Sequence, residues 1–210
     1  MSTDRQHRLA PPVWSSRERT VWNPTEAEIA AHRAVDELFC SGSVLPYATF
    51  AGARVFPVVA WNFSAVKDRV REGIEPFLSP RAVQDRLCDG TAGPSPLHML
   101  GFVGIGQLAY GRRELAGLRS MGRTVAVTSF KHRPRRMTLT EYDVQGTTVV
   151  AASGDGARVL VGGDSGPRLG SGMAPVWLRF YEEQLFEWGM RHRLPGFAQA
   201  TSRQAPWKVG

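Results

Sequence analysis

Hydrophobic residues recur with two different periods along this chain, and the change comes near residue 123. Close to the N-terminus, Ala27, Ala31 and Leu38 lie four and seven positions apart, the spacing of an amphipathic helix. Asn23-Pro24-Thr25-Glu26 adds a cap, a proline at the first helical position and a glutamate three residues after the cap. The pattern therefore predicts a helix from Pro24 to about Cys40.

Short elements are predicted between residues 43 and 95. Strands are expected at residues 43–50 and 54–61, because the second is rich in the Val, Phe and Trp that suit a pleated surface. Helices are expected after Ser64 and from Ser79-Pro80 to Asp89-Gly90, each with a serine cap. This part of the chain predicts helices with a short pair of strands.

The pattern from Leu97 to Tyr110 fits either a helix or a strand. Ser95-Pro96 resembles a helix start, and Leu108, Leu115 and Leu118 favour a helix from about residue 108 to Met121. A continuous helix is disfavoured by four glycines, each of which costs about 1 kcal/mol relative to alanine inside a helix. They are Gly101, Gly104, Gly106 and Gly111.

From Arg123 the period is two. Val125 and Val127 alternate with polar residues, and residues 137–142 alternate in the same way. Two more strands are expected at residues 147–152 and 157–161, joined by tight turns at 143–146 and 153–156. These four segments predict a four-stranded antiparallel β-meander.

A C-terminal amphipathic helix is predicted from Pro175 to about Met190. The pairs Arg179 with Glu183 and Glu187 with Arg191 have the i,i+4 spacing of helical ion pairs. The whole pattern predicts an α+β protein with one domain at residues 23–193, between extended arms at residues 1–22 and 194–210. Because an exposed indole is costly in water, three tryptophans are expected to anchor these arms to a partner: Trp14, Trp22 and Trp207.

The composition, 42% hydrophobic and 21% charged, is that of a globular protein. No transmembrane helix is expected, because the longest nearly uncharged run, residues 44–66, is broken by Pro46, Arg54 and Pro57. Cys40 and Cys88 fall on predicted helices, so buried free thiols in a reducing compartment are expected.

The positive charge is concentrated in one stretch. Residues 112–136 contain eight basic residues and one acidic residue, so their net charge of +7 equals that of the whole chain. The basic residues are Arg112, Arg113, Arg119, Arg123, Lys131, Arg133, Arg135 and Arg136. Such a cluster predicts a patch for an anionic partner, namely RNA, anionic lipid head groups or an acidic protein surface.

Gly104-Ile105-Gly106-Gln107-Leu108-Ala109 fits the pattern G-x-G-x-x-A. Over about 35 of the 210 residues the chain resembles the first β-α-β unit of NADP-binding Rossmann proteins. The resemblance implies a pyrophosphate at the glycine loop and an arginine near residues 130–136 for a 2′-phosphate. The predicted antiparallel strands, joined by tight turns, do not fit the parallel sheet that this fold requires.

Gly163-Asp164-Ser165-Gly166-Pro167 is similar to the nucleophile loop of chymotrypsin-like serine proteases. The resemblance implies Ser165 as nucleophile, with His32 and either Asp85 or Asp89 as its partners. The chain lacks the glycine that this family has between the positions of Gly166 and Pro167.

These features predict a non-catalytic accessory subunit of a large assembly of organellar respiratory or ribosomal type. It would dock through its arms and its arginine-rich patch, and its expected location is the mitochondrion or otherwise the cytoplasm. No catalytic residue, cofactor or metal is assigned under this hypothesis. The alternatives are an NADP-dependent oxidoreductase that uses the Gly104–Gly106 loop and, less favoured, a serine hydrolase that uses Ser165.

Overall fold

The computed structural model describes residues 22–39, 41–167, 172–194 and 197. They form two compact units. The first holds the described residues up to Val59 and those from Met99 to Met173, and the second holds Ala60–His98 and the described residues from Ala174 onward. The predicted domain of residues 23–193 therefore contributes residues to both units.

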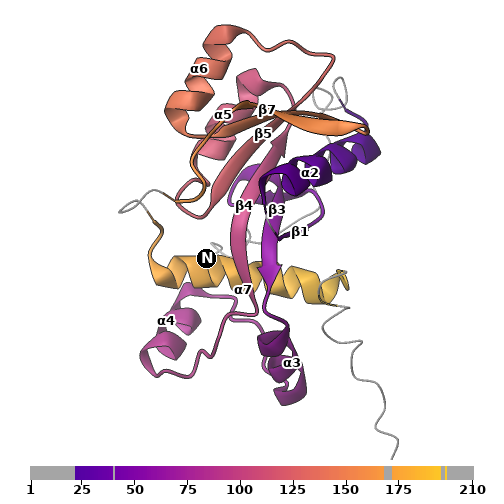
Figure 1. Cartoon of the computed structure of the whole chain (residues 1–210). Coiled ribbons are helices and arrows are strands. Elements are labelled where there is room, and N and C mark those ends of the chain that lie inside the picture. Colours follow the sequence, from indigo (N-terminus) through magenta and orange to yellow (C-terminus); the bar gives the residue numbers. More distant parts are fainter. Residues whose placement is uncertain (1–21, 40, 168–171, 195–196, 198–210) are drawn as a thin grey trace, which may run out of the picture. The chain divides into compact units, whose positions relative to one another are not determined.

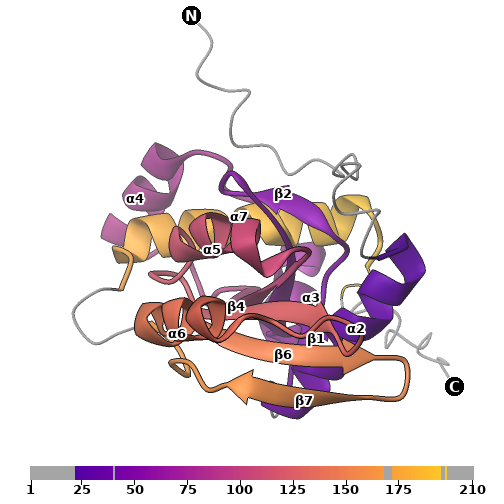
Figure 2. The same ribbon diagram turned by 90° about the horizontal axis from the view of Figure 1, so that it is seen from above.

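The first unit is built on a mixed sheet with helices on its two faces (Figures 1 and 2). The strands of the sheet are β1 (Ser43–Val44), β2 (Ala48–Phe50), β3 (Ala53–Trp61), β4 (Leu97–Ile105), β5 (Arg123–Ser129), β6 (Thr148–Ser153) and β7 (Gly156–Val161). The last two residues of β3 and the first two of β4 are assigned to the second unit. The helices of the first unit are α2 (Pro24–Leu38), α5 (Leu108–Ala116) and α6 (Arg136–Gln145).

The strand order within the described residues is β1-β3-β4-β5-β6-β7, and β2 pairs with β3 off this path. Strand β5 pairs in parallel with both β4 and β6. The other pairings are antiparallel: β3 with β1 and with β2, and β6 with β7. Helix α5 connects β4 to β5 and α6 connects β5 to β6. The segment from β4 to β6 is therefore a β-α-β-α-β unit.

The prediction of a mixed helix-and-strand protein is confirmed, but the four-stranded antiparallel meander is wrong. Residues 137–142 lie in helix α6, so the connection between β5 and β6 is a parallel crossover. An alternation of six residues is too short to exclude a helix. The inward side of α6 is formed by Thr138, Leu139 and Tyr142 at helical spacing, and Gly146 ends the helix with a φ of +72°.

Capping signals predicted two helix starts correctly. Asn23 and Glu26 form a capping box at the start of α2, and Ser79 Oγ accepts a hydrogen bond from the Ala82 N–H at the start of α4 (Pro80–Cys88). Ser95-Pro96 has the same sequence signal but precedes strand β4. The Ser95 hydroxyl donates a hydrogen bond to the Leu97 carbonyl at 2.7 Å, so it does not cap a helical turn.

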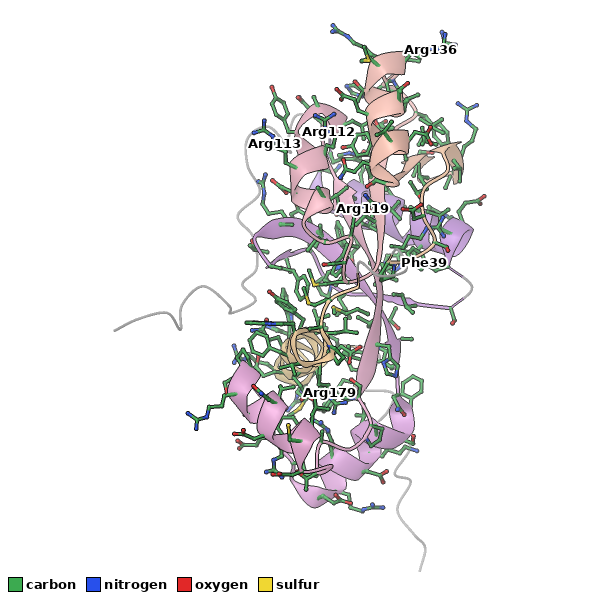
Figure 3. All side chains as sticks on the ribbon, turned by 90° about the vertical axis from the view of Figure 1, so that its left-hand side faces the viewer. Phe39, Arg112, Arg113, Arg119, Arg136 and Arg179 are labelled. Atoms are coloured by element: carbon green, nitrogen blue, oxygen red, sulfur yellow. The ribbon has the colours of Figure 1, made fainter. Side chains whose placement is uncertain are left out.

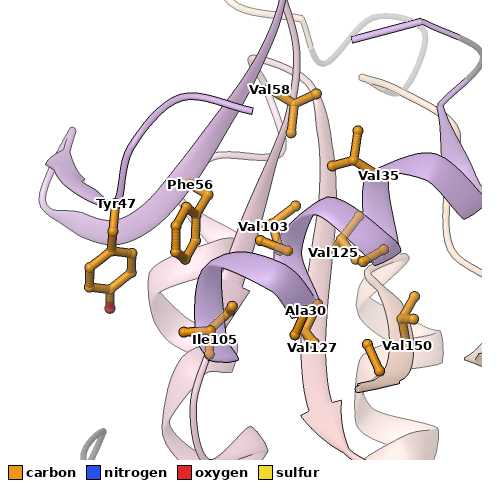
Figure 4. Packing of buried hydrophobic residues seen from close by; sticks show 14 of the residues in the cluster. Ala30, Val35, Tyr47, Phe56, Val58, Val103, Ile105, Val125, Val127 and Val150 are labelled. Atoms are coloured by element: carbon orange, nitrogen blue, oxygen red, sulfur yellow. The ribbon is translucent and has the colours of Figure 1, made fainter. Parts of the chain in front are cut away.

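Helix α2 covers one face of the sheet. Its buried residues, among them Ala30 and Val35, pack against Val103, Val125 and Val150 of the parallel strands (Figure 4). Four of the five buried residues of α2 are alanines, and these small side chains let the helix approach the sheet closely. Helices α5 and α6 contact β5 and β6 and cover the opposite face.

The second unit contains α3 (Phe63–Glu72), α4 and α7 (Pro175–Arg191). Asn62 caps α3 through its side chain, where Ser64 was predicted. The small hydrophobic core of the unit consists of Phe77, Val83, Ala92 and Phe180.

A buried ion network joins α3 to α7 inside the second unit. The Glu183 side chain is fully buried and accepts hydrogen bonds from Arg69 Nη1 at 2.7 Å and from Arg179 Nε at 2.8 Å. Arg179 also donates to the carbonyls of Ala92 and Pro94 at 3.1 and 3.2 Å. The predicted pair of Arg179 with Glu183 is confirmed, and it lies in the interior.

Two expectations drawn from composition can be compared with the structure. None of the helices within the described ranges is long and apolar enough to cross a bilayer. Cys88 is a free thiol, as predicted, but it is exposed at the C-terminal end of the short helix α4, where a buried position was expected. Cys40 lies outside the described residues.

Candidate functional site

The glycine-rich stretch is the end of strand β4 followed by the start of helix α5. A Cβ atom at Gly104 would lie 3.2 Å from the Cδ atoms of Leu115, so glycine here lets α5 pack tightly on β4. Gly106 has a φ of +148°, a backbone conformation that other residues rarely adopt, and its Cα faces open space. The two glycines thus set the approach of the helix and the turn that leads into it.

An open cavity of about 290 Å³ lies at the carboxyl ends of β4 and β5. Its walls are residues 106–109 at the start of α5, residues 132–135 in the loop after β5, Thr128 near the end of β5, and Thr138 in the first turn of α6. We call this space the carboxyl-edge cavity. Ligands of open α/β sheets bind at this edge of the parallel strands, where the strand ends meet the helix starts.

Two helices begin at the carboxyl-edge cavity without a side-chain cap. The N-cap residues Gln107 of α5 and Arg135 of α6 make no side-chain hydrogen bond to their first turns, whereas Asn23, Asn62 and Ser79 cap α2, α3 and α4. In α5 the Tyr110 N–H donates to the Gln107 carbonyl at 3.0 Å. Other first-turn amide groups generally have no acceptor within their own helix, and the positive end of the helix dipole adds to their attraction for an anion.

The hydroxyl of a threonine adds a further donor to the cavity. Thr128 is only 4% exposed and lines the carboxyl-edge cavity, and its side chain makes no hydrogen bond to any residue in the described part of the chain. Thr128 is therefore available to a ligand that enters the cavity.

Tyr142 fixes one wall of the cavity relative to the other. Its hydroxyl donates a hydrogen bond to the Leu108 carbonyl at 2.7 Å, and Gln145 Nε2 donates to the Arg112 carbonyl at 3.0 Å, so α6 is tied to α5 at two points. Burial raises the pKa of Tyr142 well above its ordinary value. The hydroxyl therefore stays protonated and keeps donating.

Three of the eight predicted partner-binding residues are engaged in internal contacts. Arg112 forms an ion pair with Glu141 at 2.6 Å, and Arg119 forms one with Asp164 at 2.6 Å. Arg123 donates to the Leu38 carbonyl at 2.8 Å and to Thr148 Oγ1 at 3.3 Å, and its guanidinium lies 5.5 Å from the centre of the Phe39 ring. Burial lowers the pKa of Arg123.

The other five predicted residues are exposed and form no ion pair within the described residues. They are Arg113, Lys131, Arg133, Arg135 and Arg136. Figure 3 shows Arg113 on α5 and Arg136 at the start of α6, with Arg119 further along the unit. Four of the five lie in residues 131–136, which we call the basic loop, and Arg133 and Arg135 also line the carboxyl-edge cavity.

The three tryptophans predicted as arm anchors have different positions. Trp22 is 5% exposed and belongs to the core cluster around α2, so its indole packs inside the first unit. Trp14 and Trp207 lie outside the described residues.

The residues of the serine-hydrolase alternative are not linked to one another. His32 on α2 and Ser165 are exposed, and no hydrogen bond joins them, while Asp164 is paired with Arg119. Asp85 and Asp89 lie in the second unit, in α4 and at its C-cap. Within the described ranges, no three His, Cys, Asp or Glu side chains form a group that could hold a metal ion.

Comparison with known proteins gives no match: no protein-family model fits the chain, and no curated protein or solved structure is significantly similar to it.

Proposed function

We propose that the first unit binds a small phosphate-bearing ligand in the carboxyl-edge cavity, and that this ligand is a nucleotide. The observation that carries this proposal is the convergence of the uncapped N-termini of α5 and α6 on one cavity that also holds the Thr128 hydroxyl. Each of these groups donates hydrogen bonds, and a phosphate offers several acceptor oxygens.

The charge of the cavity supports an anionic ligand. Arg133 and Arg135 line the cavity and have no ion-pair partner among the described residues. His132, which precedes them in the loop after β5, lines it too. Among the described residues, no aspartate or glutamate lines the cavity. A ligand with two or more negative charges would therefore meet donors and cations and no opposing carboxylate.

The size of the cavity favours a mononucleotide over a complete dinucleotide. Its volume of about 290 Å³ lies just below the roughly 300–1,000 Å³ typical of small-molecule sites. Dinucleotide folds combine two β-α-β-α-β halves, whereas the parallel strands β4, β5 and β6 make one half. An NADP-dependent oxidoreductase is the narrower form of this proposal, with one half of the cofactor in the cavity.

A thermal-shift titration of the full chain tests this function. We expect AMP, ADP or NADPH to raise the melting temperature in a saturable way, since a ligand that binds only the folded state stabilises it. Gly106→Asp places a carboxylate at the cavity and should abolish the shift, whereas Gly154→Asp, in the exposed β6–β7 turn, should leave it unchanged. If no nucleotide at millimolar concentration shifts the melting temperature, the proposal is wrong.

A second candidate is the accessory subunit of an organellar respiratory or ribosomal assembly. The exposed, unpaired cations of the basic loop favour it, because they offer a surface to an anionic partner. Native electrophoresis of the endogenous protein tests this candidate. We expect migration within a complex far larger than the 23.1 kDa chain, and migration as a free monomer would refute it.

A further inference from the structure

Two exposed apolar side chains flank the basic loop. Phe130, directly before the loop, is 45% exposed, and Met137, directly after it, is 73% exposed. The segment 130–137 therefore has an apolar residue at each end and four unpaired cations between them. It contains no acidic residue, and the next acid along the chain, Glu141, is paired with Arg112.

This combination costs free energy in water. Exposed Phe and Met side chains forgo the stabilisation that burial would give, and unpaired cations repel one another across a short loop. Both costs disappear at a surface that offers apolar volume next to negative charge. The interface of a lipid bilayer has this composition, with acyl chains directly below anionic head groups.

We propose that residues 130–137 dock the protein onto an anionic lipid bilayer. Phe130 and Met137 enter the boundary between head groups and acyl chains, while Lys131, Arg133, Arg135 and Arg136 contact lipid phosphates. Pro134 restricts the backbone in the middle of the loop, which lowers the entropy lost on docking.

The apolar residues favour a bilayer over RNA as the partner. RNA-binding surfaces stack bases on aromatic rings, and Met137, the more exposed of the two flanking side chains, has no aromatic face. An acidic protein surface would account for the cations, but a flexible thioether at this exposure is better suited to an acyl environment. RNA therefore serves as the alternative in the test.

Docking does not depend on an occupied cavity. Arg133 and Arg135 belong to both surfaces, but Phe130 and Met137 do not line the cavity. Substituting these two residues therefore changes membrane docking while nucleotide binding continues.

Sedimentation of the full chain with lipid vesicles tests the proposal. We expect binding to vesicles of phosphatidylcholine with phosphatidylserine, and little binding to phosphatidylcholine alone. Phe130→Ser and Met137→Ser should each weaken binding about tenfold, from the lost burial of one large apolar side chain. Arg136→Gln should weaken it about fivefold, and added salt should weaken it further.

Matched variants separate docking from general effects. Val144→Ser makes a similar change on α6, about 10 Å further along the helix axis, and Arg158→Gln removes an exposed cation from β7. Both should bind vesicles like the wild type. Circular dichroism and the nucleotide thermal shift should be unchanged in all five variants, which separates failure of this inference from failure of the proposed function.

Three results would overturn the inference. The first is equal binding to neutral and anionic vesicles, and the second is no binding to either. The third is binding to anionic vesicles that Phe130→Ser and Met137→Ser leave intact, because the apolar residues would then have no part in it. Tight binding of single-stranded RNA together with that third result would assign the loop to RNA.

Discussion

Arginines have opposite roles in the two units. In the second unit, Arg69 and Arg179 are buried and share one carboxylate, Glu183, and their remaining donors are directed at backbone carbonyls. At the carboxyl-edge cavity of the first unit, Arg133 and Arg135 are exposed and have no ion-pair partner among the described residues. The first pair holds the fold together, and the second remains available to a ligand.

This difference shows why a count of charges along the sequence does not locate a binding surface. The stretch 112–136 carries the net charge of the chain, yet Arg112, Arg119 and Arg123 are engaged in internal contacts. Arg69 and Arg179 contribute no net exposed charge, although sequence alone does not distinguish them from surface arginines. The contacts of each guanidinium decide its role.

The largest effect is expected from the buried network. Glu183→Gln leaves two buried guanidiniums without a counter-charge, and removing one partner of a buried ion pair typically costs about 3–5 kcal/mol. We therefore expect urea unfolding to show a loss of this size in the free energy of unfolding. Glu187→Gln, on the same helix, breaks the partly exposed pair with Arg191 and should cost at most about 1 kcal/mol. Equal losses for the two variants would remove the distinction between structural and available arginines.

A smaller loss is expected from the backbone at the cavity. Gly106→Ala places a Cβ on a residue with a φ of +148°, and such strain costs about 1–3 kcal/mol. Chemical denaturation measures this loss. Gly154→Ala is the matched control, because the backbone there has a negative φ and nothing lies near the added Cβ. If both variants are equally stable, the turn into α5 does not depend on glycine.

The neighbouring carboxylates Glu182 and Glu183 have different partners within the second unit. Ser95 Oγ lies 2.7 Å from the Leu97 carbonyl and 2.6 Å from Glu182 Oε2, but a hydroxyl has a single proton to donate. When that proton goes to the carbonyl, the second contact requires a proton on Glu182. Burial raises the pKa of Glu182 and so favours this form, while hydrogen bonds from Ser95 and His98 and the charges of His98 and Arg179 oppose it.

The stability of the second unit should therefore depend on pH through Glu182. A carboxyl whose pKa is raised in the folded state contributes stability that is complete below its unfolded pKa of about 4.3 and is lost as the pH rises through the folded pKa. We expect urea midpoints of the wild type to fall as the pH increases above about 4, and those of Glu182→Gln to fall less. Parallel pH profiles would contradict a protonated Glu182.

The smallest effect on stability is expected from the cavity arginines. Arg133→Gln and Arg135→Gln should each change the free energy of unfolding by less than about 0.5 kcal/mol, because neither side chain has an internal partner among the described residues. Arg119→Gln, which breaks the partly buried pair with Asp164, should cost more. Calorimetry of the three variants measures the difference, and a larger loss for Arg133 or Arg135 would show that these residues also stabilise the fold.

Local capping chemistry made part of the fold predictable. The capping box of Asn23 and the Ser79-Pro80 signal located two helices, since each depends on residues within one turn. The helix start predicted at Ser95-Pro96 was wrong because the hydroxyl of Ser95 contacts Leu97 and Glu182, and Glu182 lies 87 residues away in the sequence. The strand predicted at residues 137–142 was wrong because the inward side of this segment depends on how α6 packs against α5 and β6.

The candidate site was predictable only where its signal is local. The glycine pattern around Gly104 and Gly106 was visible, because close packing and an unusual φ require glycine. Thr128 looked like an ordinary polar residue of an alternating strand, and its burial beside a cavity depends on two helices. Tyr142 was assigned to a strand, so its bond to Leu108 could not be expected.

The second unit consists of two segments that lie far apart in the sequence, so the ribosome synthesises them at different times. Residues 60–98 leave the ribosome early, but Glu183, which neutralises Arg69, follows 114 residues later. Until α7 emerges, Arg69 has no internal counter-charge and the small core lacks Phe180. All residues of the first unit have been synthesised once Met173 is added, so we expect this unit to fold first during translation. Residues 60–98 can complete their core and ion network only after helix α7 has been synthesised.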